Sequence, residues 1–155
     1  MNREHLIFAL RAVGQSASTL LGLCPRDKLA FRPGEGMRSL GELADHFAAQ
    51  PLVDLAVLQG NPAEVTETIE ETLHSARPEE WVEIFERGIR AVVEYFESLT
   101  EEEFATLATR AHYGSSHPQS VWLLDLINHV YHHRGQLYVY LKMLGLPVDV
   151  EHLYT

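Results

Sequence analysis

Residues 119–144 read QSVWLLDLINHVYHHRGQLYVYLKML, and this stretch decides the fold class. Pro118 provides a suitable start for a helix, because proline is tolerated in the first helical turn. Lys142 lies in the expected last turn, Gly145 fits the position just after the helix, and Pro147 follows. Apolar residues cover most of the circumference of this helix, so we expect it to be the most buried helix of the fold.

Three further segments carry apolar residues three and four positions apart, which is the period of an amphipathic helix. They lie before Pro25, between Ser39 and Gly60, and from Pro78 to residue 99. Their apolar positions are Leu6, Leu10, Val13, Ala17, Leu20, Leu21, Leu40, Leu43, Phe47, Trp81, Ile84, Phe85, Ile89, Val92, Val93, Phe96 and Leu99. Together with residues 119–144 they predict an all-α, four-helix bundle in one domain, residues 1–155, with a long connection between the second and third helices.

Ser39 and Glu42 have the spacing of a capping box, in which each side chain satisfies a backbone N–H of the first helical turn. The second helix therefore begins after Ser39. Pro51 lies inside the same segment. Because proline has no N–H to donate, we expect it to kink this helix or split it.

The connections contain short helices. Asn61 and Pro62 resemble a helix cap and first helical residue, and a helix to about residue 74 would face inward with Val65, Ile69 and Leu73. Residues 100–117 begin with a second capping-box pattern and continue into a polar loop, HYGSSH. No alternating pattern predicts a β-strand.

The composition excludes several classes of function. The formal net charge is −10, which disfavours nucleic acid and anionic membranes as partners. No apolar stretch approaches the roughly 20 residues of a membrane-spanning helix, and the first residues contain too short an apolar run for a signal peptide. The single cysteine, Cys24, cannot form a disulfide within the chain. We expect a cytoplasmic protein that acts on a small molecule.

Three of the nine histidines suggest a metal site. His129 and His133 are four residues apart, so their rings lie on one face of the helix, one turn apart. His46 lies on the apolar side of the second helix, beside Phe47. An unpaired imidazole is costly in apolar surroundings, and a divalent metal ion would satisfy all three rings. The alternative is that the pair simply faces solvent or a partner helix.

Two familiar metal motifs are absent. The residues between His129 and His133 contain no glutamate, so this is not the H-E-x-x-H motif of metalloproteases. A di-iron bundle would need two Glu-x-x-His pairs, and only Glu71 and His74 have that spacing.

Three stretches of the chain resemble the DinB-like (DinB/YfiT) superfamily of metal-binding four-helix bundles. They are LAFRPGEGMRSLGELADH, which ends at His46, NHVYHHRGQ at residues 128–136, and LKMLGLP at residues 141–147, which ends the last helix. The resemblance covers nearly the whole chain. It implies a site in which His46, His129 and His133 bind zinc or nickel beside a cleft, and it implies a homodimer. Some members are thiol S-transferases that use a low-molecular-weight thiol.

Asp125 and Gln136 are candidates for orienting the ligand rings, because they lie one turn before His129 and three residues after His133. Arg134 is a candidate anchor for an anionic substrate or a member of a structural ion pair. His132 lies about 60° from the line of His129 and His133 and is interpreted as a bystander or a residue at the rim of the site. His112 and His117 lie in the loop before the last helix, where they are expected to be solvated, with a place at the mouth of the site as the alternative. Cys24 is expected in the core.

Two functions remain open from the sequence. A three-histidine site leaves one coordination position free, which is typical of catalytic zinc and favours a metal-dependent thiol transferase or hydrolase. The chain offers no identifiable general base beside the ligands. This favours the alternative, a non-catalytic bundle in which the metal is structural or sensory.

Overall fold

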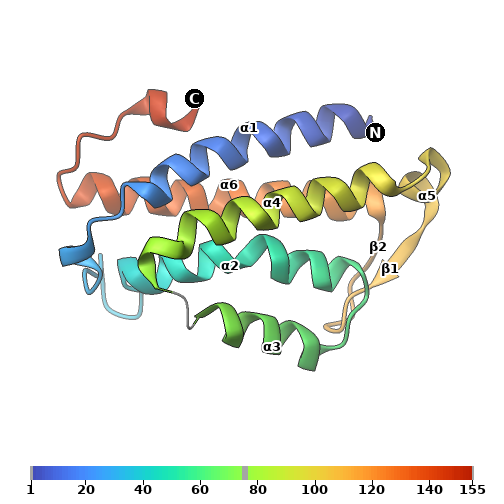
Figure 1. The fold of residues 1–155 in the computed structure, drawn as a ribbon, viewed down its shortest axis with the longest axis horizontal. Helices are drawn as coiled ribbons and strands as arrows, with labels where there is room; N and C mark the ends of the chain where they lie inside the picture. Colours follow the sequence, from blue (N-terminus) through green and yellow to red (C-terminus); the bar gives the residue numbers. More distant parts are fainter. Residues whose placement is uncertain (1, 75–76, 155) are drawn as a thin grey trace.

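Four long helices pack side by side in a computed structural model of the chain, which describes residues 2–74 and 77–154 (Figure 1). They are α1 (Arg3–Gly22), α2 (Leu40–Leu58), α4 (Trp81–Ser98) and α6 (Gln119–Met143). α1 packs on α4 and α6, and α2 packs on the same two helices from the other side. Each long helix therefore has two long neighbours, and the fold is the all-α bundle that the sequence predicts.

The ends of these helices follow their local sequence. The Asn2 side chain accepts a hydrogen bond from the His5 backbone N–H at the start of α1. Ser39 and Glu42 form the predicted capping box at the start of α2. Gly145 follows α6 with a φ of 78°, a left-handed conformation that glycine adopts without steric cost.

Pro51 does not split α2, which continues from Leu40 to Leu58. Proline requires space on the neighbouring turn and on any helix packed beside it, and Gly88 of α4 provides that space. A Cβ atom at Gly88 would lie 2.9 Å from Cβ of Pro51. The glycine on α4 therefore lets α4 pack closely on Pro51 while α2 continues through it.

α2 is the most buried long helix, not α6 as the sequence predicted. Ten of its 19 residues are buried, compared with ten of the 25 residues of α6. The reason is that a further helix, α3 (Ala63–His74), covers the outer side of α2 (Figure 1). On α6 the apolar side chains of Tyr131, Val139 and Met143 are exposed.

The connections differ from the prediction in two places. In α3, Val65 is exposed and Thr66 is buried, so the expected inner face was partly wrong. The second difference follows α5 (Glu101–Thr106), which the second capping box begins. There, strands β1 (Ala108–Arg110) and β2 (Ser116–Pro118) form a two-stranded antiparallel hairpin, with Thr109 opposite His117.

Short 3-10 turns complete the chain: η1 (Arg26–Lys28), η2 (Pro78–Glu80) and η3 (Val150–Leu153). Arg134 fixes the last of these against α1, because its guanidinium donates to Ser16 Oγ at 3.1 Å and to the Leu153 carbonyl at 2.6 Å. It also lies over the ring of Tyr131. Arg134 thus has a structural role.

Within residues 2–74 and 77–154, no helix has the length and apolar character that a membrane span requires.

Candidate metal centre

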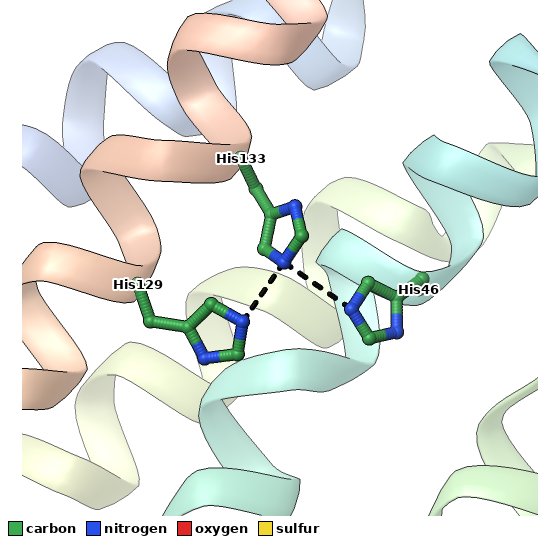
Figure 2. Close-up of side chains that lie close together, drawn as sticks. All are labelled: His46, His129 and His133. Carbon is green, nitrogen blue, oxygen red and sulfur yellow. Dashed lines mark hydrogen bonds between the residues drawn. The ribbon is translucent and has the colours of Figure 1, made fainter. Parts of the chain in front are cut away.

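Three imidazole rings meet between α2 and α6 (Figure 2). His46 comes from α2, and His129 and His133 come from successive turns of α6. Nε2 of His133 lies 3.2 Å from Nε2 of His46 and 2.9 Å from Nε2 of His129. The structure therefore brings together the three histidines that the sequence singled out, each with the same nitrogen facing the centre.

The other nitrogen of each ring faces an oxygen acceptor. Nδ1 of His129 lies 2.9 Å from Asp54 Oδ2 and 3.1 Å from Gln50 Nε2, and Nδ1 of His133 lies 2.8 Å from Gln136 Oε1. Nδ1 of His46 lies 3.4 Å from Glu70 Oε1. An acceptor at Nδ1 favours the tautomer that carries its proton there. All three Nε2 lone pairs then point into the same small space.

Neutral rings in this tautomer cannot hydrogen-bond to one another through Nε2, because each offers only a lone pair. Two ligand nitrogens on one tetrahedral zinc ion are about 3.3 Å apart, given Zn–N bonds of about 2.0–2.1 Å. The separations of 3.2 and 2.9 Å are close to that value, and the three ligand atoms all lie within 4.8 Å of one another. The donor set therefore fits a divalent metal ion with three imidazole ligands and one free position.

The pKa values of the three rings are not all shifted in the same direction. Burial lowers the pKa of His133 to about 3. Burial, with Arg38 nearby, also lowers the pKa of His46. The hydrogen bond to Asp54 raises the pKa of His129. His46 and His133 are thus held neutral at physiological pH, as metal ligands require, while Asp54 increases the basicity of His129.

Two of the acceptors were not predicted from the sequence. Gln136 contacts His133 as expected, but the acceptor at His129 is Asp54 and not Asp125. Asp54 lies two turns after His46 on α2, and the intervening Gln50 donates from Nε2 to the same Asp54 oxygen. Gln50 and Asp54 lie four and eight residues after His46, so the helical period could have predicted that they share its face of α2.

Glu70 was the other missed acceptor, because it comes from α3 and nothing in the sequence places that helix over His46. It belongs to a chain of contacts. His74 lies between Glu70, at 3.3 Å from Nε2, and Asp45, which it contacts through Nδ1. Asp45 also accepts a hydrogen bond of 3.0 Å from Trp81 Nε1. α3 and α4 therefore support the His46 side of the centre.

The remaining histidines near the centre are not part of it. The His132 ring packs against His133, but the residue is exposed on α6. His117 packs on Trp122, and His112 lies on the exposed hairpin loop. Cys24 is buried at the end of α1, and burial raises the pKa of its thiol to about 12, so it is not a nucleophile at neutral pH.

A cavity of about 110 Å³ adjoins His129 on the side of Asp54. Its walls come from α2, α6 and the hairpin loop, and the lining residues are Asp54, Val57, Leu58, Tyr113, Trp122, Asp125, Leu126 and His129. Asp125 thus lies near the centre, in the wall of this cavity. The arrangement gives the candidate metal centre a space in which a small substrate group can lie.

Solved structures share this fold. A protein described as a member of the DinB family, from Exiguobacterium sibiricum, has a TM-score of 0.80 with 23% identity, and the match covers 97% of this chain and 96% of that one. A DinB-like protein from Bacillus cereus has a TM-score of 0.76 with 23% identity, covering 94% and 95%. A mycothiol-dependent maleylpyruvate isomerase has a TM-score of 0.66 with 16% identity, covering 88% of this chain and 61% of that one.

No curated protein matches the sequence. The model of the DinB family matches residues 1–151, almost the entire sequence that builds the bundle and the three-histidine centre. The chain belongs to the DinB family.

Proposed function

We propose that this protein is a metal-dependent enzyme that binds one divalent ion through His46, His129 and His133 and acts on a small molecule. Zinc and nickel are the ions we expect, because imidazole suits both and both bind nitrogen ligands more strongly than manganese or iron. The reaction we favour is transfer of a thiol to an electrophile. Hydrolysis by an activated water is the related possibility for the same site.

One observation carries this proposal. All three Nε2 atoms face one point, while all three Nδ1 atoms face an acceptor outside it. A polar cluster built only for stability would alternate donors and acceptors, because facing lone pairs repel. The observed orientation becomes favourable when a cation occupies the centre.

A divalent ion in such a site acts as a Lewis acid and lowers the pKa of a thiol or water bound to it. The residues of the chain have their own tasks. Asp54, Gln136 and Glu70 hold the three rings in the orientation that directs Nε2 inward. The cavity beside His129 receives the substrate. Three protein ligands leave a coordination position free for the thiol or water, as in catalytic zinc sites.

The preference for thiol transfer has support in the fold. The mycothiol-dependent maleylpyruvate isomerase, whose name specifies a thiol cofactor, shares it over 88% of this chain. Cys24 is buried and lines neither the centre nor the adjoining cavity. The reacting thiol would therefore be a separate low-molecular-weight molecule.

The alternative is a non-catalytic bundle in which the metal joins two helices. It is favoured by the origin of the ligands, since one comes from α2 and two from α6. The two functions differ in what the protein becomes without metal, because a structural ion is needed for folding and a catalytic ion is not.

The test of the proposal is the metal content of protein purified without a histidine tag. We expect wild type to bind close to one equivalent of zinc or nickel and His133→Ala to bind almost none. His132→Ala is the matched control, because it removes the neighbouring imidazole, which lies outside the centre. Wild type that binds neither ion after incubation, or His132→Ala that loses metal as His133→Ala does, would contradict the site. If the site binds metal as expected, the metal-loaded protein is next screened with thiols and electrophiles.

A further inference from the structure

The size and the lining of the cavity beside His129 limit the kind of substrate group that can bind there. It holds about 110 Å³, and a cavity of about 150 Å³ is large enough for benzene, so this one suits a group of a few heavy atoms. It adjoins the ring of His129 and lies on the Nδ1 side, where Asp54 contacts that ring. A substrate group placed there would extend from the candidate metal centre.

Two carboxylates line this cavity, and the basic side chain in its wall is the imidazole of His129. Among the described lining residues none is Lys or Arg, and Asp54 and Asp125 are the charged members. Asp54 uses Oδ2 for His129 and Gln50. Within the described part of the chain, Asp125 is exposed and has no hydrogen bond or ion pair. One carboxylate oxygen of Asp54 and the whole carboxylate of Asp125 are thus available to a ligand.

Two aromatic side chains complete the walls. Trp122 is held in place because its Nε1 donates to the Thr109 carbonyl at 3.1 Å and the His117 ring packs against it with centroids 5.0 Å apart. Tyr113 lies on the hairpin loop and lines the cavity from the opposite element. Aromatic faces attract a cation through their quadrupole, most strongly for Trp.

We propose that this cavity binds a positively charged amine group of the substrate, between Asp125, Asp54 and the ring of Trp122. The inference rests on the proposed function, because it assigns this group to the molecule that reacts at the metal centre. Carboxylates and aromatic faces both favour a cation, and an anion would face two like charges in a partly enclosed site.

The experiment uses tetramethylammonium as the probe, because a quaternary ammonium ion has no lone pair and cannot coordinate a metal. The full chain, with and without zinc, is titrated at constant ionic strength while the indole N–H signals are followed by NMR. The sequence contains two tryptophans, so Trp81 serves as an internal control beside Trp122. We expect a saturable shift of the Trp122 signal alone, and no comparable shift with neutral tert-butanol.

Two variants make the test specific. Asp125→Asn should weaken binding of tetramethylammonium about tenfold, because one of the two negative charges that attract the cation is lost. Asp27→Asn, which makes the same change of charge on the exposed η1 turn, should leave binding unchanged. Equal shifts with tert-butanol, equal binding by Asp125→Asn, or no shift at Trp122 would each overturn the proposal.

The outcome of the tetramethylammonium titration can be distinguished from the outcome of the metal-binding test. Bound zinc is measured in the same samples, so a protein that binds one zinc ion but no tetramethylammonium contradicts only the amine inference. A protein that binds the cation at Trp122 but no zinc or nickel retains the cavity and contradicts the proposed enzyme.

Discussion

A histidine presents only one nitrogen to a metal, so the partner of its other nitrogen decides whether the ring is ready to bind. In this protein that partner is different for each ring: a carboxylate for His129, an amide for His133 and a more distant carboxylate for His46. The three rings are therefore not equivalent. Asp54 is the closest charged acceptor, and we expect it to contribute most to the metal affinity.

Asp54→Ala should weaken zinc binding by about 10- to 100-fold, the usual effect of removing a group that orients a metal ligand. The affinity would be measured by competition with a chelator at fixed pH. Asp125→Ala is the control, since Asp125 lies in the same cavity wall without contacting His129 Nδ1. Equal affinities of the two variants would show that the Asp54 contact has no role in binding.

Glu42 supports a pH prediction at the start of α2. The hydrogen bond from Arg32, with that from the Ser39 backbone, lowers the pKa of Glu42 from 4.5 to about 2. A carboxyl whose pKa is lower in the folded state stabilises the fold above its unfolded pKa, and this stability is lost as pH falls toward the folded pKa. The contribution should thus be constant above about pH 4.5 and decline between pH 4.5 and 2.

This is checked with Glu42→Gln, which cannot ionise. The difference in free energy of unfolding between wild type and variant, from urea denaturation, should be constant from pH 7 to 5 and shrink below pH 4.5. Glu35→Gln, at an exposed position of the preceding loop, should show no such trend. A difference that grows on acidification has the wrong sign and would contradict the assignment.

The sequence predicts interactions of a residue with its own helix well and interactions between distant residues poorly. The His129–His133 spacing and the contact of Gln136 with His133 are set by one helical turn. Glu70 reaches His46 only because α3 folds back over α2, and no local pattern records that. Asp54 is intermediate, since it shares a helix with His46 but meets His129 across the bundle.

At the scale of whole elements, the same limit explains why the effect of Pro51 and the hairpin after α5 were not predicted. The capping boxes and apolar stripes are local, and the helices they predict are present. The residue that packs on Pro51 is Gly88, which is 37 positions further along the chain and lies opposite it on α4. The hairpin after α5 has strands of three residues, too short to show an alternating pattern.

Gly88→Ala tests the contact that accommodates Pro51. Its added Cβ would lie 2.9 Å from Pro51 Cβ and 3.3 Å from Leu52 Cγ. Overpacking of this kind costs about 1–3 kcal/mol, which exceeds the gain of up to about 1 kcal/mol from replacing glycine in a helix. We expect a net loss of stability, measured as a lower midpoint of urea unfolding.

The control is Gly135→Ala on α6, where an added Cβ meets nothing within 4 Å. Only the helix-propensity term applies there, so this variant should be more stable by about 0.5–1 kcal/mol. If both substitutions changed stability in the same direction, close packing of Gly88 on Pro51 would not be what distinguishes the two positions.

At the scale of the whole molecule, the apolar core does not depend on the candidate metal centre. One cluster of buried side chains runs through α1, α2, α4 and α6, and it includes large residues such as Phe47, Phe85 and Phe96. The three histidines lie at one side of it, with His46 and His129 partly exposed. Burial of apolar area provides most of the free energy of folding, so the bundle should form before any metal binds.

Removing the metal should therefore leave the protein folded. We expect the far-UV circular dichroism of chelator-treated protein to match that of zinc-loaded protein, with a cooperative thermal transition at a lower temperature. Zinc at 100 times its dissociation constant would raise stability by about 2.7 kcal/mol and should have no such effect on His133→Ala. Loss of helical signal and of cooperative unfolding in metal-free wild type would instead support the structural role, because a metal that staples α2 to α6 is needed for folding.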